Sequence, residues 1–406
     1  MYKLYCRLYQ RVMKLASYAF DWTEPTLLKG PGSVMELPAL IKSLGLGRVL
    51  LVTDAGLMKI GLPNPLLREL EDAGIACAVY KDTNVNPTLT NIADARRMYA
   101  GASCEAVIAF GGGSPMDCAK GVCMRIAYPN MKLKGLKVTL MRRLPLLFAV
   151  PTTAGTGSEV TIAAVITDAD THKKNVLMTP KVRPKYAVLD PALTAGLPPH
   201  ITSTTGMDVL THAIEAYIGG SNTKLSAQKA LNATKLVFQY LDRAYKSGGD
   251  MEAREQMLLA SYDGGMAFTR AYVGYVHAIA HCLGGLYGTP HGLANAIILP
   301  HVLDFFGAAA HARLADLYGV AGLSGEETPA EKAKAFIKAI RDMNAAMGIP
   351  ALLDNVKKED VPIIAARALK EANPLYPVPV IINQKQCEAL VRSMMGVAVA
   401  AQTIIN

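Results

Sequence analysis

The stretch TGMDVLTHAIE, Thr205–Glu215, places carboxylate and imidazole side chains on one face of a predicted helix. Asp208, His212 and Glu215 are separated by four and then three residues, so they share a face at the helical period. Their neighbours are mostly apolar, as expected of a buried helix. Buried polar side chains are costly unless something satisfies them, so this stripe indicates a candidate site.

A second apolar helix repeats the pattern further along the chain. In VHAIAH, Val276–His281, the histidines His277 and His281 are four residues apart, and His291 follows a glycine-containing turn. One carboxylate and three imidazoles can hold a divalent metal and leave a position for substrate. For either helix alone, hydrogen-bonded core histidines are the commoner explanation. The two helices together favour a metal site, although spacing does not settle which three or four residues bind.

Upstream of these helices, apolar strand-like segments alternate with helical ones such as Pro65–Ala73 and Ile92–Tyr99. This alternation predicts a parallel sheet with helices on both faces. After Asp190 the patterns are helical only. The predicted strands are Arg48–Asp54, Ala76–Tyr80, Glu105–Phe110, Leu146–Val150 and Tyr186–Leu189.

Two of these strands lead directly into glycine-rich polar loops. The first loop, GGGSPMD (Gly111–Asp117), can turn sharply, with Ser114 as the expected cap of a helix whose N-terminus suits a pyrophosphate. By itself such a turn can be a mere tight connection. The second loop, PTTAGTGSE (Pro151–Glu159), puts hydroxyls where open sheets bind ligands, with a solvated turn as the alternative.

An acidic residue ends the first predicted strand. Asp54 is placed to accept hydrogen bonds from an adenine ribose and to repel a 2′-phosphate, which predicts a preference for NAD(H) over NADP(H). The alternative is that Asp54 only caps the following helix, because Asp is a favoured cap.

Composition limits the class of protein. The chain has 406 residues, of which 51% are hydrophobic and 18% charged, enough for two packed domains. Seven scattered cysteines without a Cys-x-x-Cys pair suit a reducing, cytoplasmic environment. No apolar run reaches membrane-spanning length. The net charge of +9 is concentrated in residues 1–14 and 118–158, without a motif for reading nucleic acid.

The first twenty residues predict an amphipathic helix, without the clean apolar run and small-residue cleavage site of a secretory signal. We expect this helix to dock on the protein body or on a partner subunit. The alternatives are contact with a membrane surface or an address for a larger assembly. One stripe of the helix is cationic and its neighbour is apolar: Lys3, Arg7, Arg11 and Lys14, beside Leu4, Leu8, Val12 and Leu15.

Several motifs occur together in the order of a known family. Gly206-Met207-Asp208 with His212, and then the three later histidines, resemble the iron-dependent (group III) alcohol dehydrogenases from about Trp22 to Gly396. The resemblance implies that His281 lies beside nicotinamide and substrate without binding the metal. It also implies four metal ligands, which are Asp208, His212, His277 and His291.

The same resemblance implies where the dinucleotide binds. The glycine turn followed by Asp117 and Lys120 is similar to the family's dinucleotide loop, whereas Ala163 stands where some relatives carry a polar cofactor-facing residue. The expected NAD-binding residues are Asp54, Asn86, Gly111, Gly112, Gly113, Ser114, Asp117, Thr152, Thr153, Thr156 and Lys174.

We therefore expect an amphipathic extension at 1–21, an NAD-binding α/β domain with a parallel sheet at 22–195, and an all-α metal and substrate domain at 196–406. The resemblance implies an NAD(H) alcohol dehydrogenase or aldehyde reductase for a small alcohol or carbonyl, as a homodimer or a multiple of it. Its metal is expected to be Fe²⁺, with Zn²⁺ as the alternative, because N and O ligands accept either.

Two other functions compete with the dehydrogenase. A non-redox, metal-dependent lyase of the dehydroquinate synthase type would be built on a related fold, but the full set of motifs matches the dehydrogenases better. A non-catalytic binding or assembly protein predicts damaged ligands, and all four candidate ligands are intact.

One cation lies close in sequence to the second histidine helix. Arg270 precedes His277 by seven residues, so in an unbroken helix it points toward the metal cleft. We expect it to pair with a carboxylate such as Glu215, since buried charges are rarely left alone. The alternative is that it binds a carboxylate or other polar end of the substrate.

Overall fold

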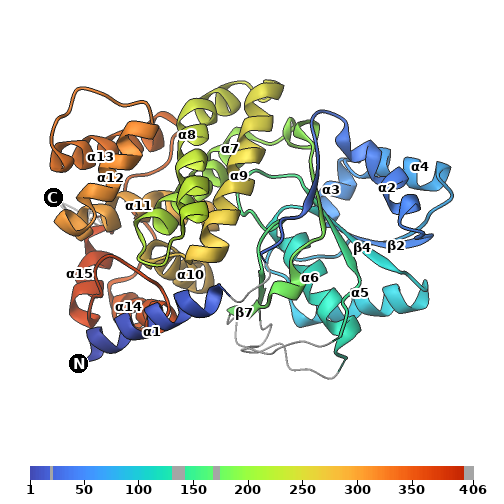
Figure 1. Cartoon of the computed structure of the whole chain (residues 1–406), viewed down its shortest axis with the longest axis horizontal. Helices are drawn as coiled ribbons and strands as arrows, with labels where there is room; N and C mark the ends of the chain where they lie inside the picture. Colours follow the sequence, from blue (N-terminus) through green and yellow to red (C-terminus); the bar gives the residue numbers. More distant parts are fainter. Residues whose placement is uncertain (19–21, 130–141, 168–173, 397–406) are drawn as a thin grey trace, which may run out of the picture.

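The computed structural model describes residues 1–18, 22–129, 142–167 and 174–396. This part of the chain forms an α/β half and a helical half, and helix α1 (Tyr2–Ser17) lies against the helical half (Figure 1). Three cations of the predicted basic segment, Lys132, Lys134 and Lys137, lie outside the described residues.

A six-stranded parallel sheet organises the α/β half, in the order β1-β8-β5-β4-β2-β3. All five predicted strands are present, with ends shifted by no more than a residue or two. The short edge strand β1 and the antiparallel pair β6–β7 were not predicted. The strands are β1 (Thr26–Lys29), β2 (Arg48–Val52), β3 (Ala76–Tyr80), β4 (Ala106–Gly111), β5 (Leu146–Pro151), β6 (Ala163–Thr167), β7 (Lys174–Met178) and β8 (Tyr186–Leu189).

The central strands are buried on both faces, which explains their continuous apolar sequence. Alternate residues of β4 pack into separate cores, with Val107 on one side of the sheet and Ile108 on the other. The helices that cover the sheet are α2 (Leu37–Ser43), α3 (Ala55–Lys59), α4 (Asn64–Asp72), α5 (Leu89–Gly101) and α6 (Gly113–Ala127).

The strand order creates a natural ligand crevice. From β2 the chain passes outward to β3 and then returns to β4 on the other side of β2, so the direction of winding reverses between β2 and β4. Open parallel sheets bind ligands at the carboxyl ends of the strands that flank such a reversal. Asp54 follows β2 and the glycine turn follows β4, so both predicted cofactor elements lie at this edge.

The second half is built from helices packed around one large apolar core. Helix α7, the predicted Asp/His helix, packs against α8, α9 and α11. The helices are α7 (Pro199–Ile218), α8 (Lys224–Lys246), α9 (Met251–Ala271), α10 (Tyr275–Tyr287), α11 (His291–Phe306), α12 (His311–Val320), α13 (Pro329–Ala346), α14 (Val361–Ala372) and α15 (Gln384–Ser393). The predicted domain boundary at 195–196 falls between β8 and α7.

Among the described residues, one segment, His291–Ala309, is long and apolar enough to cross a membrane by length and composition. It was not anticipated from the sequence. More than half of it, 56%, is buried inside the structure, as expected of a core helix.

Candidate metal centre and cofactor loops

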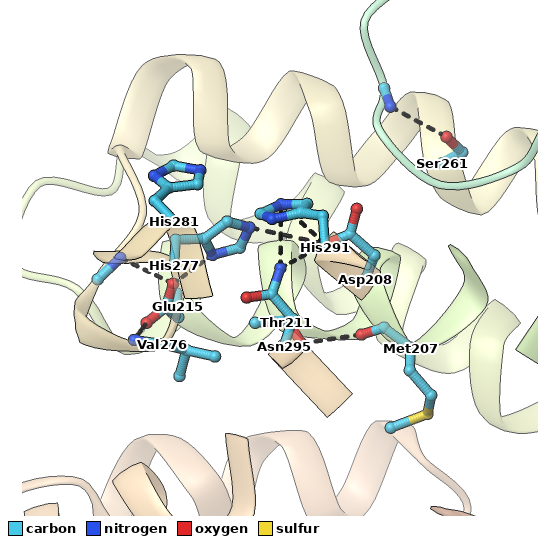
Figure 2. A network of polar contacts seen from close by, with 12 residues as sticks. Met207, Asp208, Thr211, Glu215, Ser261, Val276, His277, His281, His291 and Asn295 are labelled. Carbon is cyan, nitrogen blue, oxygen red and sulfur yellow. Dashed lines mark hydrogen bonds and ion pairs between the residues drawn. The ribbon is translucent and has the colours of Figure 1, made fainter. Parts of the chain in front are cut away.

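Three helices of the second half bring four side chains together. Figure 2 shows three of them, Asp208, His277 and His291. Asp208 and His212 come from α7, His277 from α10 and His291 from α11. Their potential ligand atoms all lie within 4.8 Å of one another. These are the four residues that the family resemblance implied, and their mixed N and O donors suit a first-row divalent metal.

The chemistry of the four side chains fits a metal ion. Nε2 of His277 is buried, has no hydrogen-bond partner and lies 3.7 Å from Oδ1 of Asp208. Burial lowers the pKa of His212 and of His277 well below the usual value, so both imidazoles stay neutral, the form that binds metals. Burial also raises the pKa of Asp208 to about 7, which makes its anion costly without a nearby cation.

A buried carboxylate orients one of these imidazoles. Oε2 of Glu215 lies 2.7 Å from Nδ1 of His277 and accepts a hydrogen bond from the backbone N–H of Gly274 at 2.8 Å, while Oε1 accepts from Val276 N–H at 2.8 Å. The carboxylate thus closes the N-terminus of α10 and turns Nε2 of His277 toward Asp208 (Figure 2). A Cβ at Gly274 would lie 2.6 Å from Oε1 of Glu215, so this approach requires glycine.

His281 stands outside the four-residue group, one helical turn after His277. Its ring lies 5.1 Å from that of His291, centroid to centroid, and nearly parallel to it. Its Nδ1 lies 2.7 Å from Oε1 of Glu371 on α14, and the same oxygen accepts a hydrogen bond from the Tyr376 hydroxyl at 3.0 Å. His281 is therefore held by its own carboxylate, just as His277 is held by Glu215.

Sequence reasoning missed two residues that shape this centre. Asn295 donates to Oδ1 of Asp208 at 2.7 Å and lies 3.2 Å from Nε2 of His291. Its position four residues after His291 on an apolar helix was a signal of a shared face. Glu371, in contrast, is remote in sequence from every candidate ligand, and no local pattern marks it.

The glycine turn lies where predicted, but its helix is capped differently. Helix α6 begins at Gly113 with Gly112 as its N-cap, so the prediction that Ser114 caps it is wrong. The Ser114 hydroxyl instead donates to the carbonyl of Val85, because the segment after β3 packs beside this turn. An ideal Cβ at Gly113 would lie 2.8 Å from the Thr156 methyl, so the two polar loops are in close contact.

Two residues predicted beside the dinucleotide hold the second loop in place. Asp117 accepts hydrogen bonds from the Ser158 hydroxyl at 3.0 Å and from Val165 N–H at 2.9 Å. The fully buried Lys120 donates to Ser158 and Thr161, both at 2.9 Å, and to the carbonyl of Ala163 at 2.8 Å. Burial lowers the pKa of Lys120 to about 8.

The remaining predicted cofactor residues flank the same edge of the sheet. Thr152 is buried and its N–H bonds to the carbonyl of Gly111, whereas Thr153 is half-buried beside Gly112. Asn86 is exposed, next to the residue that Ser114 contacts. Lys174 begins β7, and its side chain lies outside the described part of the structure.

Asp54 does cap the helix that follows it. One carboxylate oxygen, Oδ1, accepts a hydrogen bond from Leu57 N–H at 2.9 Å. The capping alternative is therefore present in the structure, and contact with a ribose stays a prediction.

The expected position of Arg270 is wrong. Helix α9 ends at Ala271 and α10 begins at Tyr275, because Tyr272 adopts a positive φ of 66° between them. The break turns Arg270 away from the metal cluster. Its guanidinium instead lies over the Trp22 ring, 5.2 Å from the centroid, and donates to the Trp22 carbonyl at 3.0 Å.

A parallel sheet with a glycine turn at its switch point, followed by a helical domain in which one aspartate and three histidines converge, is the arrangement of an enzyme that uses a nucleotide and a metal. Two family models together match most of the chain. The model for iron-containing alcohol dehydrogenase matches residues 25–191, and the model for the C-terminal part of the Fe-containing alcohol dehydrogenase family matches residues 202–395. The chain belongs to the iron-containing alcohol dehydrogenase family and is an alcohol dehydrogenase or aldehyde reductase.

Individual relatives agree with this assignment. The chain is 39% identical to 1,3-propanediol dehydrogenase of Citrobacter freundii over 365 residues, 87% of this chain and 93% of the relative. A crystal structure of 1,3-propanediol oxidoreductase has 36% identity and a TM-score of 0.87, covering 93% of this chain and all of that one. Sulfoacetaldehyde reductase of Bifidobacterium kashiwanohense, solved with NAD⁺, has 29% identity and a TM-score of 0.82 over 93% of this chain and 99% of its own.

Proposed function

We propose that this protein interconverts a small alcohol and its aldehyde or ketone, using NAD(H) and Fe²⁺ held by Asp208, His212, His277 and His291. The observation that carries the proposal is the four-residue cluster, three of whose members are buried and whose ligand atoms all lie within 4.8 Å of one another. When bound, the metal supplies Lewis-acid polarisation of the substrate oxygen. Zn²⁺ is the alternative metal for the same donor set.

The protein's contribution at this centre is to hold its side chains in one geometry. Glu215 keeps the proton of His277 on Nδ1, which leaves Nε2 available as a ligand atom. Asn295 fixes Oδ1 of Asp208 by donating to it. The His212 ring stacks on the rings of Phe268 and His277, with centroid distances of 4.1 Å and 4.5 Å. This stacking fixes the orientation of the imidazole.

His281 is the residue that we propose to move the proton. Glu371 binds its Nδ1, so Nε2 is left to accept the alcohol proton in oxidation or to return it in reduction. Its side chain is 19% exposed, which gives the proton a route to solvent. Glu371 acts through His281 and is a positioning residue.

The edge formed by β2, β4 and β5 is the proposed dinucleotide site. The first N–H groups of α6 are available to a pyrophosphate, and the hydroxyls of Thr152, Thr153 and Thr156 lie on the loop beside them. We propose that Asp54, at the end of β2, also binds the ribose. The dinucleotide, when bound, supplies the hydride acceptor or donor.

The relatives guide the choice of substrate and setting. Their names point to short alcohols and aldehydes such as 1,3-propanediol and sulfoacetaldehyde. All seven cysteines are free, which supports a reducing cytoplasm. We also propose a homodimer or a multiple of it, to be measured by light scattering during size-exclusion chromatography.

The test combines metal analysis with turnover. Protein purified without oxygen should contain about one metal ion per chain by plasma mass spectrometry and should consume NADH with short aldehydes. His277→Ala and His291→Ala should each lose bound metal and nearly all turnover while staying folded. His281→Ala should keep the metal and lose part of the activity.

Two results would contradict the proposal. Full metal occupancy in purified His277→Ala would show that the ligand set is wrong. Absence of net NADH consumption across the aldehyde panel, in metal-loaded protein, would favour the lyase, which uses its nucleotide only transiently.

A further inference from the structure

Helix α1 exposes an unusual amount of apolar surface. Eight of the nineteen exposed large hydrophobic side chains among the described residues lie within residues 1–18. Leu4 is 74% exposed, Leu8 60%, Val12 54% and Leu15 70%. Exposed apolar patches of this kind are characteristic of interaction sites.

The helix is anchored to the body by its other, mostly polar face. Arg7 donates to the carbonyls of Val378 and Pro379, both at 2.7 Å. Gln10 is buried and donates to the carbonyls of Pro374 and Tyr376 at 3.1 Å and 2.8 Å.

Further contacts come from the same side of the helix. Cys6 is fully buried in the helical core, and Lys14 reaches the carbonyl of Gly220. Figure 1 shows α1 lying along the helical half, and its hydrogen bonds reach the segment 374–379 between α14 and α15. The apolar stripe is therefore held facing outward by anchors on the opposite side of the helix.

The outward side chains have the spacing of a helix-packing seam. Tyr5, Leu8, Val12 and Leu15 are separated by three, four and three residues, the a/d repeat of a coiled coil. Such a narrow seam suits a groove between helices. A helix lying in a lipid surface normally has a broad apolar face of Trp, Phe or Leu. In α1 the exposed apolar face holds Leu but neither Trp nor Phe.

Charge indicates what kind of surface can meet this seam. Arg11 is exposed beside the seam, Lys3 is exposed at the start of the helix, and residues 1–18 contain no acidic side chain. Two copies of α1 packed against each other would bring like charges together, which disfavours self-pairing. A partner with carboxylates beside its apolar groove would be complementary to the seam.

The helix is also separate from the part of the chain that defines the family. The family models begin at residue 25, so α1 lies outside both. The structural match with 1,3-propanediol oxidoreductase covers all of that protein but only 93% of this chain. Some residues of this chain therefore have no counterpart in that structure.

We propose that the outward face of α1, formed by Leu4, Tyr5, Leu8, Val12 and Leu15, docks a separate protein that presents an apolar helix-binding groove bordered by carboxylates. The body of the enzyme presents the helix already folded, so the partner does not have to order it. The surface lies outside the metal centre and the cofactor edge, and binding there leaves the catalytic side chains unchanged.

A synthetic acidic helix provides a defined probe. A fluorescently labelled peptide with leucine at its a and d positions and glutamate at e and g is titrated with the full-length, metal-loaded protein, and anisotropy is recorded. Binding should be saturable and should weaken as salt is raised. Leu8→Ser/Val12→Ser should raise the dissociation constant by about tenfold or more.

Matched variants distinguish binding to the seam from non-specific hydrophobic binding elsewhere on the surface. Leu225→Ser removes an exposed leucine from α8 and should leave binding unchanged. Lys3→Glu/Arg11→Glu should weaken binding in low salt. All variants should keep wild-type turnover and melting temperature, because these side chains make no contact with the catalytic centre.

Three outcomes would overturn the proposal. The first is no binding of the peptide, or equal binding by Leu8→Ser/Val12→Ser. The second is seam-dependent co-sedimentation with phosphatidylglycerol vesicles without peptide binding, which would assign the face to lipid. The third is concentration-dependent self-association that Leu8→Ser/Val12→Ser abolishes, since the occupant would then be a second copy of the chain.

Discussion

Removing the Glu215 carboxylate should weaken metal binding although Glu215 is not itself a proposed ligand. The carboxylate accepts the N–H groups of Gly274 and Val276 and binds Nδ1 of His277, with all three contacts between 2.7 and 2.8 Å. In Glu215→Ala, His277 loses the partner that selects its tautomer and ring orientation. We expect the metal dissociation constant to rise by about 10- to 100-fold.

The same substitution should lower the stability of the metal-free protein. Each buried donor left without a partner costs about 1–3 kcal/mol, and Glu215→Ala leaves two backbone N–H groups and one imidazole N–H unpaired. Glu215→Gln keeps the side-chain shape and one acceptor oxygen. However, its amide N–H₂ must face a backbone N–H, so we expect an intermediate loss.

Glu371→Ala provides a matched control. Glu371 binds Nδ1 of His281 at the same 2.7 Å distance, but His281 is not one of the four clustered residues. This variant should keep the wild-type metal affinity and lose part of its turnover, no more than His281→Ala does. Metal affinity is measured by competition with a chromophoric chelator, and stability by thermal unfolding of the stripped protein.

The comparison can refute the proposed roles of the two carboxylates. Wild-type metal affinity in folded Glu215→Ala would show that orientation of His277 does not matter for binding. Loss of metal in Glu371→Ala would mean that His281, rather than His277, belongs to the ligand set.

Three further predictions address other parts of the molecule. Wild-type protein should prefer NAD(H), and Asp54→Ser should relax that preference while keeping the α3 cap; equal kcat/KM for both dinucleotides in the wild type would count against the ribose role. Arg270→Met should lower the melting temperature because its contacts with Trp22 are lost. It should leave selectivity between an acid-bearing aldehyde and butanal unchanged, and a selective rise in KM for the acid-bearing aldehyde would instead restore the substrate role. Burial raises the pKa of Glu159 from 4.5 to about 7, so the native state binds this proton more tightly than the unfolded chain does. Below pH 4.5 the bound proton adds about 3 kcal/mol to the free energy of unfolding. This contribution is lost as pH rises from 4.5 through 7. Chemical unfolding of Glu159→Gln across that range should show a smaller fall in unfolding free energy than the wild type, and identical pH profiles would refute this.

The sequence by itself determined the features that depend on local periodicity. Apolar runs between turns predicted five of the six strands of the sheet, because central parallel strands are buried on both faces. Spacings of three and four residues placed Asp208 and His212 on one face of α7, since the helical period is the same wherever the helix lies. The glycine turn likewise marked the end of β4.

Only the tertiary structure decided which side chains meet across elements. Glu371 reaches His281 from α14, and no spacing relates the two residues. The break at Tyr272 gives α10 a different direction from α9, so Arg270 does not share a helix face with His277 and contacts Trp22 instead. For α1, the pattern predicted two stripes but not which would face the body. The polar face does, since backbone carbonyls of 374–379 are there to accept its hydrogen bonds.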